Sequence, residues 1–174
     1  MNSMKKKWIN IMFCLFLACG TAFSQECECP QVPDDAFWGT EREFKESERE
    51  VRKCLDWLGS QGLTECVSHR ESLNSYVLLW LSECPYLTVH LQPQALPFLK
   101  EYPDLLFVMI HGMAAYQLAN PKDLDPKSIH AGGLDYLTRV LKNTKTFDGK
   151  RDFKELQKLR RKRKLLEYVE LNWE

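Results

Sequence analysis

The fold of this chain is decided by one nearly unbroken apolar stretch, Leu105-Leu106-Phe107-Val108-Met109-Ile110-His111-Gly112-Met113-Ala114-Ala115-Tyr116. Pro103 suits the first turn of a helix here, and Asn120-Pro121 ends it. A segment that is apolar on nearly all sides predicts a helix buried on most of its surface. A strip of small residues on it, which would let a neighbouring helix approach closely, comprises Gly112, Ala115 and Ala119.

Two further helices are expected on the C-terminal side of this stretch. Asp125 is placed to cap a helix whose first residue is Pro126. Its inward face is predicted to comprise Ile129, Tyr136, Leu137 and Val140. The last helix is predicted from about Asp152 to Leu171.

Two amphipathic helices precede the stretch. Residues 36–58 place apolar side chains on one stripe, and residues 59–62 carry glycines typical of a helix end. A second helix is expected from near Thr64 to Pro85. The short loop between them predicts an antiparallel hairpin. Residues 86–101 are interpreted as an extended connector that leads into a short helix from about Pro93.

These segments predict an all-α protein, a single compact domain of five to six helices that begins with the antiparallel helix hairpin. The domain is assigned to residues 36–174, after an irregular leader rich in cysteine and proline at residues 25–35. About 150 residues suffice for one core of this kind.

Residues 1–24 have the three parts of a secretory signal peptide. Lys5, Lys6 and Lys7 precede the apolar run Trp8–Phe23, which closes on Ala22-Phe23-Ser24. The sequence therefore predicts export, to a periplasm or to the medium, with a mature chain that starts at Gln25. The run is short for a spanning helix, which needs about 20 apolar residues, so no transmembrane helix is expected. Leu17-Ala18-Cys19-Gly20 leaves a lipid anchor at Cys19 as the alternative.

The charge balance bears on the partner. The full chain has 24 basic and 24 acidic residues, and cleavage after Ser24 would remove three lysines. The resulting mildly acidic protein lacks the basic surface on which nucleic-acid binding depends. No nucleic-acid partner is expected.

Five cysteines follow the predicted signal peptide: Cys27, Cys29, Cys54, Cys66 and Cys84. In an exported protein these favour disulfides with one thiol left over. The expected hairpin predicts the pair Cys54–Cys66, and a second bond from Cys27 or Cys29 to Cys84. A metal or redox site at Cys27-Glu28-Cys29 is the less favoured alternative, because the chain has no zinc, haem or metalloprotease spacing. No catalytic residue, metal ligand or cofactor is predicted.

His111 interrupts the most apolar helix and has two interpretations. It is either a core histidine bonded to a backbone carbonyl or a tyrosine, which is favoured, or a polar group lining a pocket. In the second case Arg70 and Tyr116 would supply further polar groups to that pocket.

The strongest charged feature is Lys158-Leu159-Arg160-Arg161-Lys162-Arg163-Lys164, with six basic residues in seven. A basic amphipathic helix can bind an anionic envelope surface or an acidic protein. A solvated face, balanced by the glutamates between residues 41 and 50, is the favoured interpretation.

Three stretches carry a resemblance: Leu55-Asp56-Trp57-Leu58, Ser75-Tyr76-Val77-Leu78-Leu79-Trp80-Leu81 and Tyr102-Pro103-Asp104-Leu105-Leu106-Phe107-Val108-Met109. With Gly112, Tyr116 and a lysine-rich last helix, the chain resembles an uncharacterised family of small exported helical proteins from Gram-negative bacteria. His111-Gly112-Met113 and the extra cysteines depart from that pattern. The resemblance implies a helical fold and an exported location, and it implies no functional residue.

The sequence thus favours a non-enzymatic binding or structural protein of the cell envelope, and it assigns no ligand or oligomeric state. One alternative is an enzyme or small-ligand binder with a pocket near His111. The other is docking on an anionic surface through the basic C-terminal helix.

Overall fold

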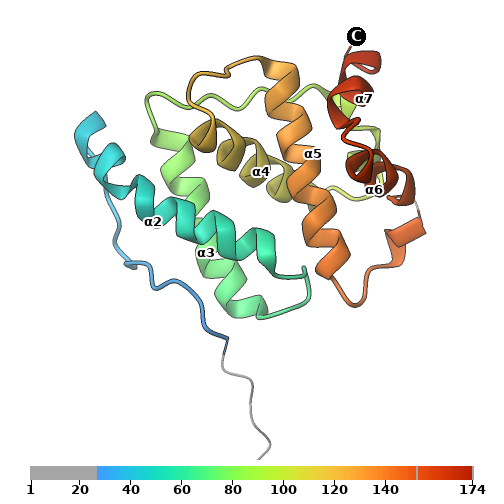
Figure 1. The fold of residues 1–174 in the computed structure, drawn as a ribbon. Coiled ribbons are helices and arrows are strands. Elements are labelled where there is room, and N and C mark those ends of the chain that lie inside the picture. Colours follow the sequence, from blue (N-terminus) through green and yellow to red (C-terminus); the bar gives the residue numbers. More distant parts are fainter. Residues whose placement is uncertain (1–26, 152, 174) are drawn as a thin grey trace, which may run out of the picture.

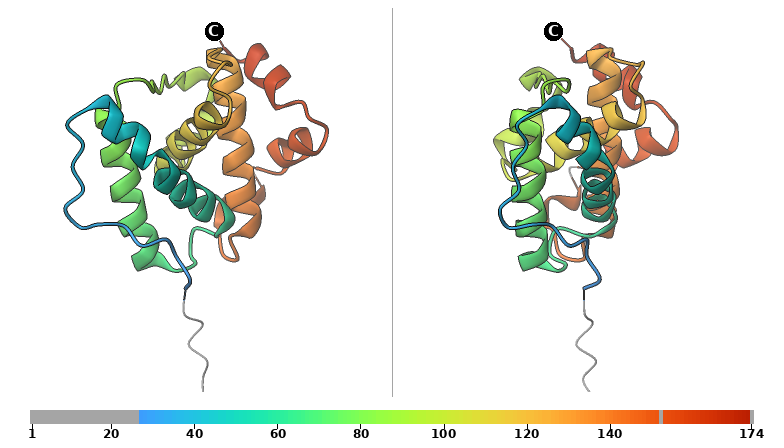
Figure 2. Two further views of the ribbon diagram at one scale, coloured as in Figure 1. Left: turned by 60° about the vertical axis from the view of Figure 1, so that its left-hand side comes forward. Right: turned by 90° about the vertical axis from the view of Figure 1, so that its left-hand side faces the viewer.

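The computed structural model describes residues 27–151 and 153–173, and it confirms an all-α fold (Figures 1 and 2). The described residues contain no strand. Their α-helices are α2 (Glu41–Ser60), α3 (Val67–Glu83), α4 (Leu105–Ala119), α5 (Pro126–Asn143), α6 (Lys154–Arg161) and α7 (Leu165–Leu171). Short 3-10 helices are η1 (Pro93–Ala95), η2 (Pro97–Lys100) and η3 (Asp148–Arg151). The predicted signal peptide, including Cys19, lies outside the described residues.

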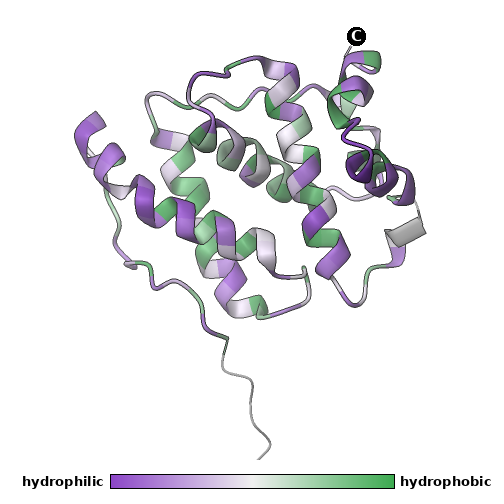
Figure 3. Cartoon of the chain, viewed as in Figure 1, coloured by the Kyte–Doolittle hydropathy of each residue, from purple (hydrophilic) through white to green (hydrophobic). Residues whose placement is uncertain are grey.

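The predicted central helix is α4, and it contributes to two hydrophobic clusters. Met109 and Met113 belong to a cluster shared with α5, α6 and α7, whereas Ala114 and Leu118 belong to one shared with α2 and α3. All four side chains are buried. Figure 3 shows that α2 and α6, at opposite sides of the molecule, are dominated by hydrophilic residues. Helix α4 is apolar on nearly all sides, and it lies where its side chains can pack into both clusters.

The closest helix pair is α4 and α5, and glycines set their separation. A Cβ atom at Gly112 would lie 2.5 Å from the Cβ of Tyr136 and 2.9 Å from the Cα of Gly133. Such a contact requires a residue without a side chain. The small strip that the sequence predicts as a close-approach surface is thus used at Gly112. Asp125 caps α5 as predicted, with its carboxylate accepting from the Ser128 N–H at 2.8 Å.

The first two predicted helices are present as α2 and α3, but the antiparallel hairpin is not confirmed. The loop between them is instead bound to the end of α5. The N–H of Leu63 donates to Oγ1 of Thr144 at 2.9 Å, and the Asn143 amide donates to the Ser60 carbonyl at 2.8 Å. A Cβ at Gly62 would lie 2.7 Å from the Asn143 carbonyl oxygen, so this loop also depends on a glycine.

The predicted disulfide pairing is wrong. The structure joins Cys27 to Cys66 and leaves Cys29, Cys54 and Cys84 as free thiols. The leader runs back past α2, where the indole of Trp57 donates to the Glu28 carbonyl, and this brings Cys27 to the start of α3. Cys54 instead faces into the α2–α3 cluster and is fully buried. The error arises because the prediction placed Cys54 level with Cys66 in an ideal hairpin.

The predicted single C-terminal helix is broken into α6 and α7. The break falls at residues 162–164, where Arg163 has a left-handed backbone with φ 58°. The break lets both short helices turn an apolar face inward, with Leu156 and Leu165 buried in the cluster around α5. In the connector before α4, residues 87–92 belong to no helix or strand, and a short helix, η1, begins at Pro93 as predicted. No helix in the described part of the chain is long and apolar enough to span a membrane.

Candidate functional site

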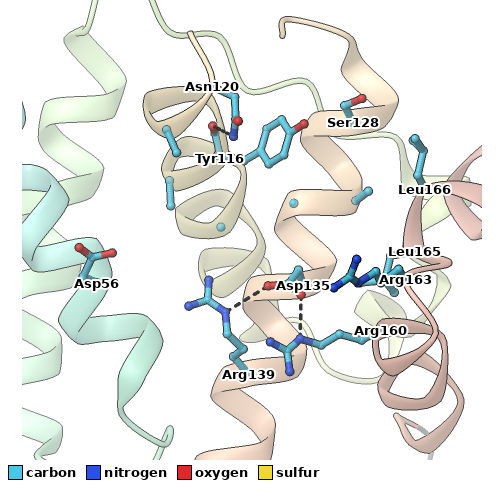
Figure 4. A pocket seen from close by; sticks show the side chains of 15 residues that line it. Asp56, Tyr116, Asn120, Ser128, Asp135, Arg139, Arg160, Arg163, Leu165 and Leu166 are labelled. Atoms are coloured by element: carbon cyan, nitrogen blue, oxygen red, sulfur yellow. Dashed lines mark hydrogen bonds and ion pairs between the residues drawn. The ribbon is translucent and has the colours of Figure 1, made fainter.

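A groove of about 540 Å³ opens over the crossing of α4 and α5, between α2 on one side and the α6–α7 turn on the other (Figure 4). Its size is typical of sites for small ligands, which usually range over about 300–1,000 Å³. A larger depression, of about 690 Å³, lies over the Cys27–Cys66 disulfide. That depression is lined mainly by loop residues, among them Glu28 and Glu65, and Trp57 is its large apolar side chain.

The floor of the groove consists of small side chains from the two crossing helices. They are Gly112, Ala115 and Ala119 on α4, and Ser128, Ala131 and Gly132 on α5. Residues of this size leave space above a helix crossing because no long side chain covers it. Leu165 and Leu166 of α7 form an apolar wall on one side. The floor and this wall provide a surface on which an apolar group can be buried.

Arginines line one end of the groove. The Asp135 carboxylate accepts from Nε of Arg160 at 2.7 Å and from Nε of Arg139 at 3.2 Å (Figure 4). Arg139 also lies over the ring of Tyr136, 5.2 Å from its centroid. Arg163 and, across the groove on α2, Asp56 complete the charged lining. Three arginines and two aspartates leave one net positive charge.

Tyr116 lies at the other end of the groove. Its ring packs against Gly132, where any Cβ would collide with it. Its hydroxyl donates to Oδ2 of Asp123 at 2.5 Å, and this hydrogen bond, with burial and the Asp123 charge, raises the pKa of Tyr116. The tyrosine is therefore a neutral, oriented wall of the groove at ordinary pH.

His111 and Arg70 lie together in the interior and do not line this groove. Both are buried, and Nε2 of His111 and Nε of Arg70 have no hydrogen-bond partner. Arg70 donates to the carbonyls of Leu58, Gln61 and Gly62 at the end of α2, at 3.0–3.1 Å. Burial, with a smaller effect from Arg70, lowers the pKa of His111 to about 3. Of the pocket residues suggested by the sequence, only Tyr116 reaches the groove.

The basic run is divided between the groove and solvent. Ion pairs join Lys158 to Glu155, Arg160 to Asp135 and Lys164 to Glu167. The expected balance with the glutamates of α2 is not observed. Four of them pair with basic residues of their own helix, and the fifth, Glu43, bonds to Thr40 at the start of the helix. Among the described residues, no carboxylate lies within ion-pair distance of Arg161, Lys162 or Arg163.

The free thiols are held in or beside the α2–α3 cluster. Cys54 and Cys84 are buried, and Cys29 is half-buried against the same cluster. Burial, reinforced by the Glu50 charge, raises the pKa of Cys54 to about 12. A thiol with such a pKa is a poor nucleophile at neutral pH, because the thiolate is the reactive form. The residues that the structure describes include no group of His, Cys, Asp and Glu placed to hold a metal ion.

Sequence reasoning missed Asp135 and Arg139, which with Arg160 form the charged end of the groove. Asp135 and Arg139 are four residues apart and share one face of α5, a spacing that favours a pair on any helix. That spacing gives no sign that a third residue, 25 positions away from Asp135, joins the pair. The groove itself could have been anticipated only from the small residues of both helices, Gly112, Ala115, Ala131 and Gly132.

Comparison of the chain with protein-family models, with curated proteins and with solved structures finds no match.

Proposed function

We propose that this protein is an exported binding protein of the cell envelope that holds a small ligand in the groove between α4, α5 and the α6–α7 turn. The observation that carries the proposal is the combination of a small-residue floor with a charged end. An apolar floor with a few convergent polar groups is the usual composition of a ligand site. Export rests on the signal-peptide pattern of residues 1–24 and agrees with the exported location that the family resemblance implies.

Binding is favoured over catalysis by the state of the polar groups around the groove. The Tyr116 hydroxyl is occupied by Asp123, and the Asp135 carboxylate by two guanidinium groups. A general base needs an available lone pair close to the substrate proton. The one histidine on α4, His111, faces Arg70 in the interior. The polar groups that line the groove are thus held in place by one another, which favours binding over proton transfer.

The test is the native mass of the protein isolated from its own envelope, measured before and after denaturation. We expect a small-molecule adduct that is lost on denaturation. The variant Ala119→Trp fills the groove from an exposed position at the end of α4, and it should emerge without the adduct. Ser75→Trp, on the exposed surface of α3, is the matched control and should retain it. A bare mass for the wild type, or equal adducts in both variants, contradicts the proposal.

A second candidate function is docking on an anionic surface through the α6–α7 turn. It is favoured by the exposed cations Arg161 and Lys162, which have no acidic partner among the described residues, and by the exposed side chain of Leu171 at the end of α7. Basic residues beside apolar ones are typical of interfacial binding. Co-sedimentation with phosphatidylglycerol vesicles, but not with phosphatidylcholine vesicles, is expected, and added salt should weaken it. Arg161→Glu with Lys162→Glu should abolish binding, whereas Lys100→Glu with Lys122→Glu should not; equal binding by both double variants contradicts this function.

A further inference from the structure

Arg163 stands at a backbone position that normally belongs to glycine. Helix α6 ends in a motif with two characteristic hydrogen bonds. The N–H of Arg163 donates to the Arg160 carbonyl at 3.0 Å, and the N–H of Lys164 donates to the Leu159 carbonyl at 2.9 Å. This is a Schellman ending, in which the residue at Arg163 must be left-handed, and its φ is 58°. Glycine is usual there because a side chain disfavours this conformation.

The side chain that replaces glycine is a lining residue of the groove. Figure 4 shows Arg163 beside Leu165 on the α6–α7 side, turned toward α5. Strained backbone conformations persist at positions where a particular side chain is needed, and they concentrate at functional sites. The unfavourable φ of Arg163 therefore indicates that its guanidinium group is needed at the edge of the groove.

Arg163 differs from the other two arginines of the groove. Arg139 and Arg160 are both bound to the Asp135 carboxylate. In the part of the chain that the structure describes, Arg163 forms no ion pair. Asp56, the remaining carboxylate of the lining, lies on α2 across the groove (Figure 4). Arg163 is thus the lining cation that an incoming anion can engage without displacing an internal partner.

The inference rests on the proposed function. We infer that Arg163 is the specificity-determining residue of the groove and that the ligand is an amphiphilic anion. Its carboxylate or phosphate group is bound by the Arg163 guanidinium, which matches either group with paired N–H donors. Its apolar part lies on Leu165, Leu166 and the small residues of the floor. The single net positive charge of the lining suits one anionic group.

The test uses probes of equal chain length and different head groups: octanoate, octyl phosphate and octan-1-ol. Calorimetric titration of the full mature protein should show that at least one of the two anions binds about tenfold more tightly than the alcohol. Arg163→Gly should remove this preference and at the same time raise Tm by about 2–4 °C, because glycine relieves the left-handed residue. Lys162→Gly, next to it in the same turn and outside the groove lining, should keep the preference and should not raise Tm.

The outcomes separate this inference from the proposed function. Loss of the anion preference in Arg163→Gly with a raised Tm supports the inference. Equal affinity of the wild type for the anions and the alcohol overturns it, as does an unchanged preference in Arg163→Gly. If the native adduct is lost in Ala119→Trp while neither anionic probe binds the wild type, the ligand class is wrong and groove binding stands. If the wild type leaves its envelope without an adduct but shows the Arg163-dependent preference, the inference stands and the proposed envelope ligand fails.

Discussion

At the scale of single residues, two buried side chains affect the stability of the fold. Arg70 stabilises it through hydrogen bonds, and His111 makes its stability depend on pH. Both are buried, and a buried charge is costly without partners. Arg70 remains charged because it binds three carbonyl groups, although burial lowers its pKa. His111 has an unpartnered Nε2 and stays neutral.

The first prediction concerns acid stability. The pKa of His111 is about 3 in the folded protein and 6.5 in a model peptide, so the unfolded state takes up the proton first as the pH falls. The stability contribution of neutral His111 is therefore complete above pH 6.5 and declines down to about pH 3. Between pH 7.5 and 5 the loss should be about 2 kcal/mol. Urea unfolding across this range should show a shallower decline for His111→Leu.

The control for this experiment is His69→Gln, since His69 is exposed. His130 adds a second decline, because burial lowers its pKa and its Nε2 accepts from the Gln92 N–H at 3.0 Å. The wild type should therefore lose stability in acid even in the His111→Leu background. Parallel pH profiles for the wild type and His111→Leu would show that His111 is protonated without cost, contrary to its burial.

A second prediction at this scale tests the role of Arg70. Arg70→Met preserves much of the side-chain volume but leaves the carbonyls of Leu58, Gln61 and Gly62 without their donor. Buried acceptors without partners are expensive, so we expect a loss of about 3 kcal/mol in the free energy of unfolding. Arg42→Met removes only an exposed ion pair with Glu46 and should change stability by less than about 0.5 kcal/mol. Similar small effects for both variants would show that the hydrogen bonds from Arg70 to the three carbonyls contribute little to stability.

At the scale of helices, the α4–α5 crossing sets both the fold and the groove. Gly112→Ala would place a Cβ 2.5 Å from Tyr136 and 2.9 Å from the Gly133 backbone, and backbone cannot rotate away. Separating the helices should cost about 1–3 kcal/mol, measured by urea unfolding. Gly39→Ala is the matched control, because its Cβ would lie no closer than 3.3 Å to the exposed Phe37 ring and 3.6 Å to Oε2 of Glu43. An equally stable Gly112→Ala would mean that the crossing is loosely packed.

The sequence predicts helices well where periodicity, caps and breakers agree. Helices α4 and α5 follow from an apolar run, from Asp125 before Pro126 and from Asn120-Pro121. The break between α6 and α7 could not be predicted, because the left-handed residue is an arginine within a basic run and not a glycine. The charged end of the groove was equally hidden, because Asp135 and Arg160 approach only through the packing of α6 beside α5.

At the scale of the whole molecule, the disulfide joins the leader to the helical domain. Cys27 and Cys66 are 39 residues apart in sequence, and the bond closes a loop that includes all of α2. On the chain-entropy model a loop of this length stabilises the fold by about 4 kcal/mol. The sequence correctly suggested a disulfide-stapled protein, but the pairing depended on a leader path that no local pattern reveals.

The last prediction combines connectivity with thiol burial. Under native conditions iodoacetamide should alkylate Cys29 first, because it is half-buried whereas Cys54 and Cys84 are buried. The raised pKa of Cys54 should slow it further. Denaturation without reductant should expose all three thiols, and reductant should be needed to release Cys27 and Cys66. Peptide mapping distinguishes this order from a Cys54–Cys66 bond, which would protect Cys54 in denaturant and leave Cys27 free.

The double variant Cys27→Ser with Cys66→Ser should then lose up to about 4 kcal/mol of stability, because its unfolded chain is no longer closed into a loop. It should still retain the helical signal of the domain, because the two hydrophobic clusters contain neither cysteine.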